Sequence, residues 1–147
     1  MRHIHFFLVF ALLLCGCGKT IVTVTGEVLY EGNPAKDIVL LFEPKSGAVK
    51  VPESGFAVTD ADGRFRLESS SGKRGIEPGT YTVYLGWNNP DTVVVDDAGP
   101  SPNAPPSKPP PYQFPVNSNN EKVVVDVQVD GNRHFVFKFT PEEIQTE

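Results

Sequence analysis

The chain has 147 residues and a formal net charge of −5, with 18 Asp and Glu against 13 Lys and Arg. An acidic chain of this kind shows no electrostatic sign of nucleic-acid binding, and an anionic membrane surface does not attract it. The length suits a single domain with its own hydrophobic core.

The first sixteen residues have the pattern of a secretory signal peptide. A short polar start contains Arg2, an unbroken apolar run extends from Phe6 to Leu14, and Cys15-Gly16-Cys17 follows. The run is about half of the roughly 20 residues that a spanning helix needs. We therefore predict a signal peptide over residues 1–16 and no permanent transmembrane anchor.

The segment Leu14-Cys15-Gly16-Cys17 resembles the lipobox of bacterial lipoproteins, in which an aliphatic residue, a small residue and Gly or Ala precede the acylated Cys. Cys17 fits the acylated position, whereas cleavage before Cys15 would place the bulky Leu14 next to the cut. We expect a lipidated Cys17, a tether over residues 17–20, and a membrane-anchored location on the periplasmic or surface side of the cell envelope. The alternative is an ordinary secreted protein that is cut nearby.

Cleavage before Cys17 also changes charge and redox chemistry. It removes one cation, Arg2, and no acid, so the mature chain is one unit more negative. It leaves Cys17 as the single cysteine, with its thiol taken by lipid, and an internal disulfide is then excluded. Stability must come from core burial in about 130 residues.

Strand patterns dominate residues 21–147. Apolar and polar residues alternate over 22–28, 64–68 and 80–85, which places the two sets on opposite faces of a strand. Ile38–Phe42 is continuously apolar and predicts a strand buried on both faces. Shorter strands are expected over 56–59 and 92–95.

The C-terminal part has the clearest alternation. Valines at alternate positions over 123–129 and phenylalanines at alternate positions over 135–139 flank Asp130-Gly131-Asn132, which predicts a β-hairpin. Taken together, the segments predict an all-β, antiparallel sandwich of about seven strands, transthyretin-like or Ig-like, with no helix longer than about two turns.

One segment cannot belong to a sheet. Eight of the 14 prolines fall between Pro100 and Pro115, and proline fixes φ and removes a backbone donor. Residues 99–115 are therefore predicted as a Pro-rich loop inserted into the sandwich domain of residues 21–147, with a spacer as its default role.

The inward-facing members of the alternating segments predict the core. They are Val24, Val28, Leu40, Phe42, Phe65, Leu67, Tyr81, Val83, Val125, Val127, Phe135 and Phe137.

Three short motifs carry a family resemblance. The first is Gly26-Glu27-Val28 followed by Gly32-Asn33-Pro34 and Val39–Pro44, the second is Thr59–Phe65 (TDADGRF), and the third is Pro78–Val83 (PGTYTV). In this order they resemble the carboxypeptidase-regulatory-like, or transthyretin-like, sandwich domains of small bacterial lipoproteins. The resemblance covers roughly Val22–Gly86 and implies an architecture. Its motifs are turns and strand entries, so it implies little about function.

Few residues suggest chemistry. Asp60-Ala61-Asp62-Gly63 begins like a calcium loop, but Ser71 stands where the bidentate Glu is needed, so a tight turn is the preferred interpretation. His134 is the only imidazole after the signal peptide, and alternation places it on the outward face of its strand. Neither a zinc site nor a Ser-His-Asp triad is therefore predicted.

We accordingly expect no catalytic residue, no metal and no cofactor. The first hypothesis is a non-enzymatic envelope lipoprotein whose sandwich is an interaction or structural module for an envelope protein or glycan. A second is a carbohydrate-binding module that uses Trp87, Tyr84 and Tyr112 as exposed rings, although packing of these rings in the core or at its rim is the preferred interpretation. A third is an enzyme of unknown type, which requires a pocket with at least two convergent titratable side chains.

Overall fold

The structure is a computed structural model that describes residues 20–45, 51–89, 109–115 and 122–147. Over these residues the chain is all-β and contains no helix, as the alternation predicts. The described residues contain ten strands, several of which have only two or three residues, so the predicted number of about seven is not confirmed. The strands are β1 Thr25–Tyr30, β2 Asn33–Pro34, β3 Ile38–Pro44, β4 Gly55–Val58, β5 Arg64–Arg66, β6 Glu68–Ser69, β7 Gly79–Trp87, β8 Lys122–Val127, β9 His134–Phe139 and β10 Ile144–Thr146.

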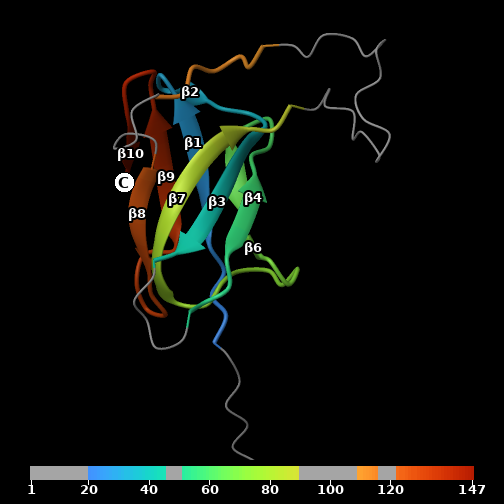
Figure 1. Cartoon of the computed structure of the whole chain (residues 1–147), viewed down its shortest axis with the longest axis vertical. Helices are drawn as coiled ribbons and strands as arrows, with labels where there is room; N and C mark the ends of the chain where they lie inside the picture. The colour runs from blue at the N-terminus through green and yellow to red at the C-terminus, as the bar shows by residue number, and fades with distance from the viewer. Residues whose placement is uncertain (1–19, 46–50, 90–108, 116–121) are drawn as a thin grey trace, which may run out of the picture.

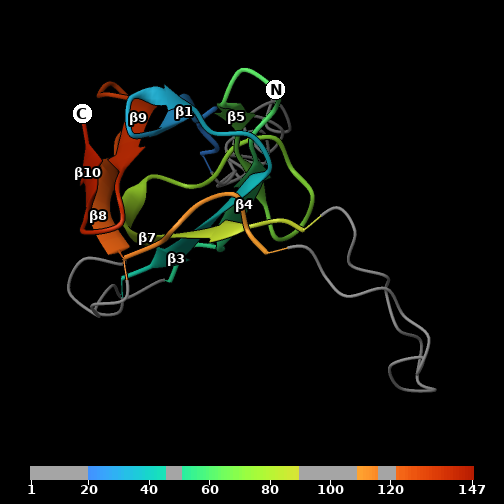
Figure 2. The ribbon, with the colours of Figure 1, turned by 90° about the horizontal axis from the view of Figure 1, so that it is seen from above.

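The strands form two sheets that pack face to face (Figures 1 and 2). The first sheet has the order β10-β9-β1-β2, and β5 also pairs with β1. Within it β1 and β9 run parallel, with Thr25 opposite His134 and Tyr30 opposite Phe139. The second sheet has the order β6-β4-β3-β7-β8 and is antiparallel throughout. The predicted antiparallel sandwich is thus correct except for one parallel pair.

The core lies between the sheets and contains every residue predicted for it. All twelve predicted core side chains are at most 5% exposed. Phe137 is fully buried, and its ring centroid lies 6.2 Å from that of Phe42, 5.9 Å from Phe65 and 6.2 Å from Phe135. The aromatic residues of both sheets therefore meet around one ring, which confirms the predicted register.

The predicted C-terminal hairpin is wrong. β8 pairs with β7 in the second sheet, and β9 pairs with β1 and β10 in the first. The six residues 128–133 cross from one sheet to the other, a step of about 10 Å between packed sheets. Alternation identified both strands and their inward faces, but it carries no information about which strand each one pairs with.

The predicted two-sided burial of Ile38–Phe42 is also wrong within this chain. Ile38, Leu40 and Phe42 are fully buried, whereas Val39 is partly exposed and Leu41 is 37% exposed. The strand lies at the centre of the second sheet, and one of that sheet's faces is turned away from the core.

The two ends of the sandwich carry different connecting segments of the chain (Figure 1). The described chain enters at Thr20, at the lower end of the view, and β1 runs from there toward the upper end. The Pro-rich connection leaves β7 after Trp87 at the upper end, and the chain is described again from Pro109 at that same end. The 92–95 strand and most of the 99–115 loop lie outside the described residues.

Candidate functional site

The most distinctive surface is the outer face of the second sheet. Six of the outward positions on four of its strands carry apolar side chains, which we call the apolar face: Val39, Leu41, Phe56, Val58, Tyr84 and Val124. The outward positions around them carry Glu43, Thr80, Thr82, Lys122 and Asp126. Five of the apolar side chains are large and well exposed: Leu41 at 37%, Phe56 at 46%, Val58 at 44%, Tyr84 at 36% and Val124 at 51%. The largest apolar patch on the surface of a soluble protein is often functional, so this face is the candidate interaction site.

Strand register makes the apolar face continuous. Leu41 on β3 lies directly opposite Phe56 on β4 and Tyr84 on β7. Val39 lies opposite Val58 on one side and Gly86 on the other. Directly opposed side chains on one sheet face are about 5 Å apart, so these residues form one flat surface rather than scattered exposures.

A hollow of about 520 Å³ lies where β1, β5 and β9 of the first sheet meet the end of β4 in the second. It is lined by Thr25, Glu27, Val58, Asp60, Arg64, Arg66 and His134, among others. In this hollow the His134 Nδ1 atom lies 3.2 Å from the Thr25 hydroxyl, and the imidazole is exposed, as predicted. The two guanidinium groups are balanced by the carboxylates of Glu27 and Asp60. The hollow therefore has no net charge to select an ionic ligand, and the one His partner is a hydroxyl rather than an orienting acid.

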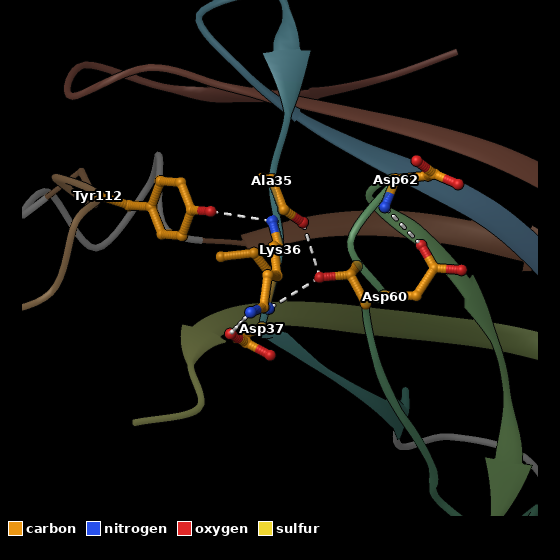
Figure 3. Close-up of polar contacts among 8 residues, drawn as sticks. Ala35, Lys36, Asp37, Asp60, Asp62 and Tyr112 are labelled. Atoms are coloured by element: carbon orange, nitrogen blue, oxygen red, sulfur yellow. Dashed lines mark hydrogen bonds and ion pairs between the residues drawn. The ribbon is translucent and has the colours of Figure 1, made fainter. Parts of the chain in front are cut away.

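The Asp60–Gly63 segment is a turn, as its preferred interpretation predicts (Figure 3). The Asp60 Oδ1 atom accepts the backbone N–H groups of Asp62 and Arg64, both at 2.9 Å. Gly63 has φ of 73°, which glycine adopts without strain. The carboxylate that would begin a calcium loop thus stabilises the turn itself. In the part of the chain that the structure describes, no three His, Cys, Asp or Glu side chains are grouped so that they could hold a metal ion.

The three rings proposed for a carbohydrate platform do not share one surface. Tyr84 belongs to the apolar face, while Trp87 is partly buried and occupies the inward parity of β7 together with Tyr81 and Val83. Tyr112 is partly buried and packs against the core beside Tyr30 and Phe139.

Tyr112 instead holds the end of the Pro-rich connection. Its ring centroid lies 5.4 Å from that of Tyr30 and 5.9 Å from that of Phe139, and Phe114 stacks on Phe139 at 5.1 Å. Its hydroxyl accepts the backbone N–H of Lys36 at 2.8 Å (Figure 3). Residues 109–115 join no strand, as predicted, but two aromatic side chains dock this segment on the sandwich.

Sequence reasoning missed the apolar face as a site. Phe56 and Val58 were recognised only as a short strand, and Leu41 was expected to be buried. The available signal was that outward positions of several predicted strands, including Val124, are apolar where a solvated face would be polar.

Comparisons with known proteins give no relative: no protein-family model matches the chain, and no curated protein matches it. Cys17, the predicted lipidation site, and Cys15 lie outside the described residues. The described residues include no helix long and apolar enough to span a membrane.

Proposed function

We propose that this protein is a non-enzymatic lipoprotein of the cell envelope, anchored through Cys17, whose sandwich domain is an interaction module of the carboxypeptidase-regulatory-like type. The observation that carries the proposal is the apolar face. Its exposed Leu, Phe, Tyr and Val side chains form a flat surface for protein contact. The acidic net charge and the turn-forming role of the TDADGRF motif agree with a scaffold that binds rather than reacts.

The tether supports a defined orientation. Only Gly18, Lys19 and Thr20 separate Cys17 from the residues of the domain, and three residues reach at most about 10 Å. Val22 is already fixed by backbone hydrogen bonds with Ile76. The lower end of the sandwich in Figure 1 should therefore rest at the lipid headgroups, and the Pro-rich connection starts at the distal end.

This orientation makes the apolar face stand upright on the membrane. The strands of the second sheet run between the two ends of the sandwich, so their outer face points sideways rather than into the bilayer. An upright apolar face is suited to contact with neighbouring proteins anchored in the same membrane.

Metabolic labelling with an alkyne fatty acid, combined with membrane fractionation, tests the anchoring. Wild type and Cys15→Ser should both be labelled and pellet with membranes, whereas Cys17→Ser should lose the label and become soluble. Cys15→Ser is the matched control, because it removes a thiol two residues away. A soluble wild type, or label that survives in Cys17→Ser, would show that the protein is not anchored in this way.

A further inference from the structure

We infer that the occupant of the apolar face is a second copy of this chain, in a two-fold dimer whose copies stand side by side in one membrane. The inference rests on the proposed function for its orientation. The self-complementary order of residues across the second sheet is the observation that identifies the partner.

The self-complementary order is found in one row of directly paired residues that crosses all five strands of the second sheet. Glu68 on β6 pairs with Phe56 on β4, Phe56 with Leu41 on β3, Leu41 with Tyr84 on β7, and Tyr84 with Lys122 on β8. The row thus reads acid, aromatic, leucine, aromatic, base, with Leu41 on the central strand. In the described part of the chain neither Glu68 nor Lys122 has an ion-pair partner.

A two-fold axis parallel to β3 through Leu41 matches this row to itself. The axis places Leu41 against the partner's Leu41, Phe56 against the partner's Tyr84, and Glu68 against the partner's Lys122. Apolar contacts are then central and opposite charges lie at the rim, which is the usual anatomy of a specific interface. Both copies keep the same direction, as two anchors in one membrane require.

A two-fold axis perpendicular to the strands does not give complementary contacts between the same residues. An axis perpendicular to the strands through this row would place Glu68 against the partner's Glu68 and Lys122 against the partner's Lys122. Like charges opposed at an interface disfavour it, and the two anchors would point in opposite directions.

The rows on either side of Leu41 add one good steric fit and one like-charge contact to the arrangement. Next to Leu41 on the distal side, the axis places Val58 over the partner's Gly86, where a Cβ would meet no atom within 4 Å. On the anchor side it places Glu43 close to the partner's Glu43. That like-charge contact is unfavourable, and it provides a test in the opposite direction.

The size of the face predicts a weak dimer in solution. Five strands about 4.8 Å apart, with the seven residues of β3 at about 3.4 Å each, cover at most about 460 Å² per copy. This area lies at the low end for specific complexes. Anchoring raises the effective concentration by confining the copies to one plane in one orientation, so the dimer should form mainly on the membrane.

Cross-linking of the full-length protein in membranes tests the contact. Lipid occupies Cys17 in the mature chain, so Leu41→Cys introduces the only free thiol. Packed sheets lie about 10 Å apart, too far for a direct disulfide, and a short bis-maleimide is therefore the reagent. Leu41→Cys should give a cross-linked dimer, and Val129→Cys should not, although Val129 is 46% exposed against 37% for Leu41, because it lies outside the apolar face.

Charge changes in the Leu41→Cys background test the arrangement. Glu68→Lys and Lys122→Glu should each lower the cross-linked fraction at least about threefold, and the two together should restore it, because the pair is only exchanged. Glu43→Gln should raise it. Absence of the dimer from labelled, membrane-bound Leu41→Cys would overturn the inference, as would equal cross-linking of Val129→Cys or failure of the exchanged pair to restore it.

The two proposals fail separately. Loss of fatty-acid label and membrane association would overturn the anchoring, and the cross-link could still be scored on concentrated soluble protein. A labelled, membrane-bound protein that stays monomeric would overturn the dimer alone.

Discussion

Truncation of Phe137 to Ala should be the most costly single change in the core. The ring is fully buried and has three aromatic neighbours within 6.2 Å, contributed by both sheets. A buried Phe→Ala change costs about 3–5 kcal/mol, and each aromatic pair adds about 0.5–1.5 kcal/mol beyond burial. We expect a loss of unfolding free energy in the upper half of that range, about 4–5 kcal/mol.

Equilibrium urea unfolding followed by Trp87 fluorescence measures the loss. Phe56→Ala is the matched control, because that ring is 46% exposed on the apolar face and its loss should cost less than about 1 kcal/mol. A domain of this size has about 5–15 kcal/mol of stability, so Phe137→Leu provides a folded variant if Phe137→Ala unfolds. Equal losses for the two alanine variants would refute the register, since a slip of one residue exchanges the faces of a strand.

Three further predictions concern single side chains. Asp60→Ala should lose about 1–2 kcal/mol of stability because two backbone N–H groups lose their acceptor, while Asp62→Ala should be close to neutral and calcium should leave the Tm unchanged in calorimetry. Burial, with a smaller contribution from the Glu77 carboxylate, raises the pKa of Tyr81 from 10.0 to about 12. Because the pKa is higher in the folded state, the stability that the protonated Tyr81 contributes is complete below pH 10 and is lost between pH 10 and 12. Tyr81→Phe should therefore flatten that part of the pH profile of urea unfolding. His134→Ala should change the unfolding free energy by less than about 0.5 kcal/mol, since the ring is exposed and its hydrogen bond within the described residues is with the Thr25 hydroxyl; a larger loss would show that the hollow around His134 is structural.

The core could be predicted from the sequence because strand periodicity is local. Each inward residue, such as Val83 or Phe135, is identified by its immediate neighbours, and a period of two fixes its face. The same locality explains the failed hairpin. The pairing of β9 with β1 joins residues more than one hundred positions apart, such as Thr25 and His134, and no local pattern encodes it.

The site could be predicted only in part for a related reason. The continuous apolar run at Ile38–Phe42 predicts burial of both faces of the strand, but a local run of residues cannot show whether the rest of the chain covers the second face. Within the described residues Leu41 has no such cover. The packing of Tyr112 against the core agrees with the preferred interpretation of this ring, but its hydrogen bond to Lys36 spans 76 positions of sequence and no local pattern predicts it.

Accessibility of the apolar face on the membrane tests the central claim most directly. The measurement is the rate at which a monofunctional maleimide labels Leu41→Cys in native membranes, compared with the same protein diluted in detergent and with Val129→Cys in both states. If the face is an interface, Leu41→Cys should react several-fold more slowly in membranes and recover on dilution, while Val129→Cys reacts equally fast in both. Equal rates for Leu41→Cys in membranes and in dilute detergent would contradict the account, because the apolar face would then be uncovered where the protein acts.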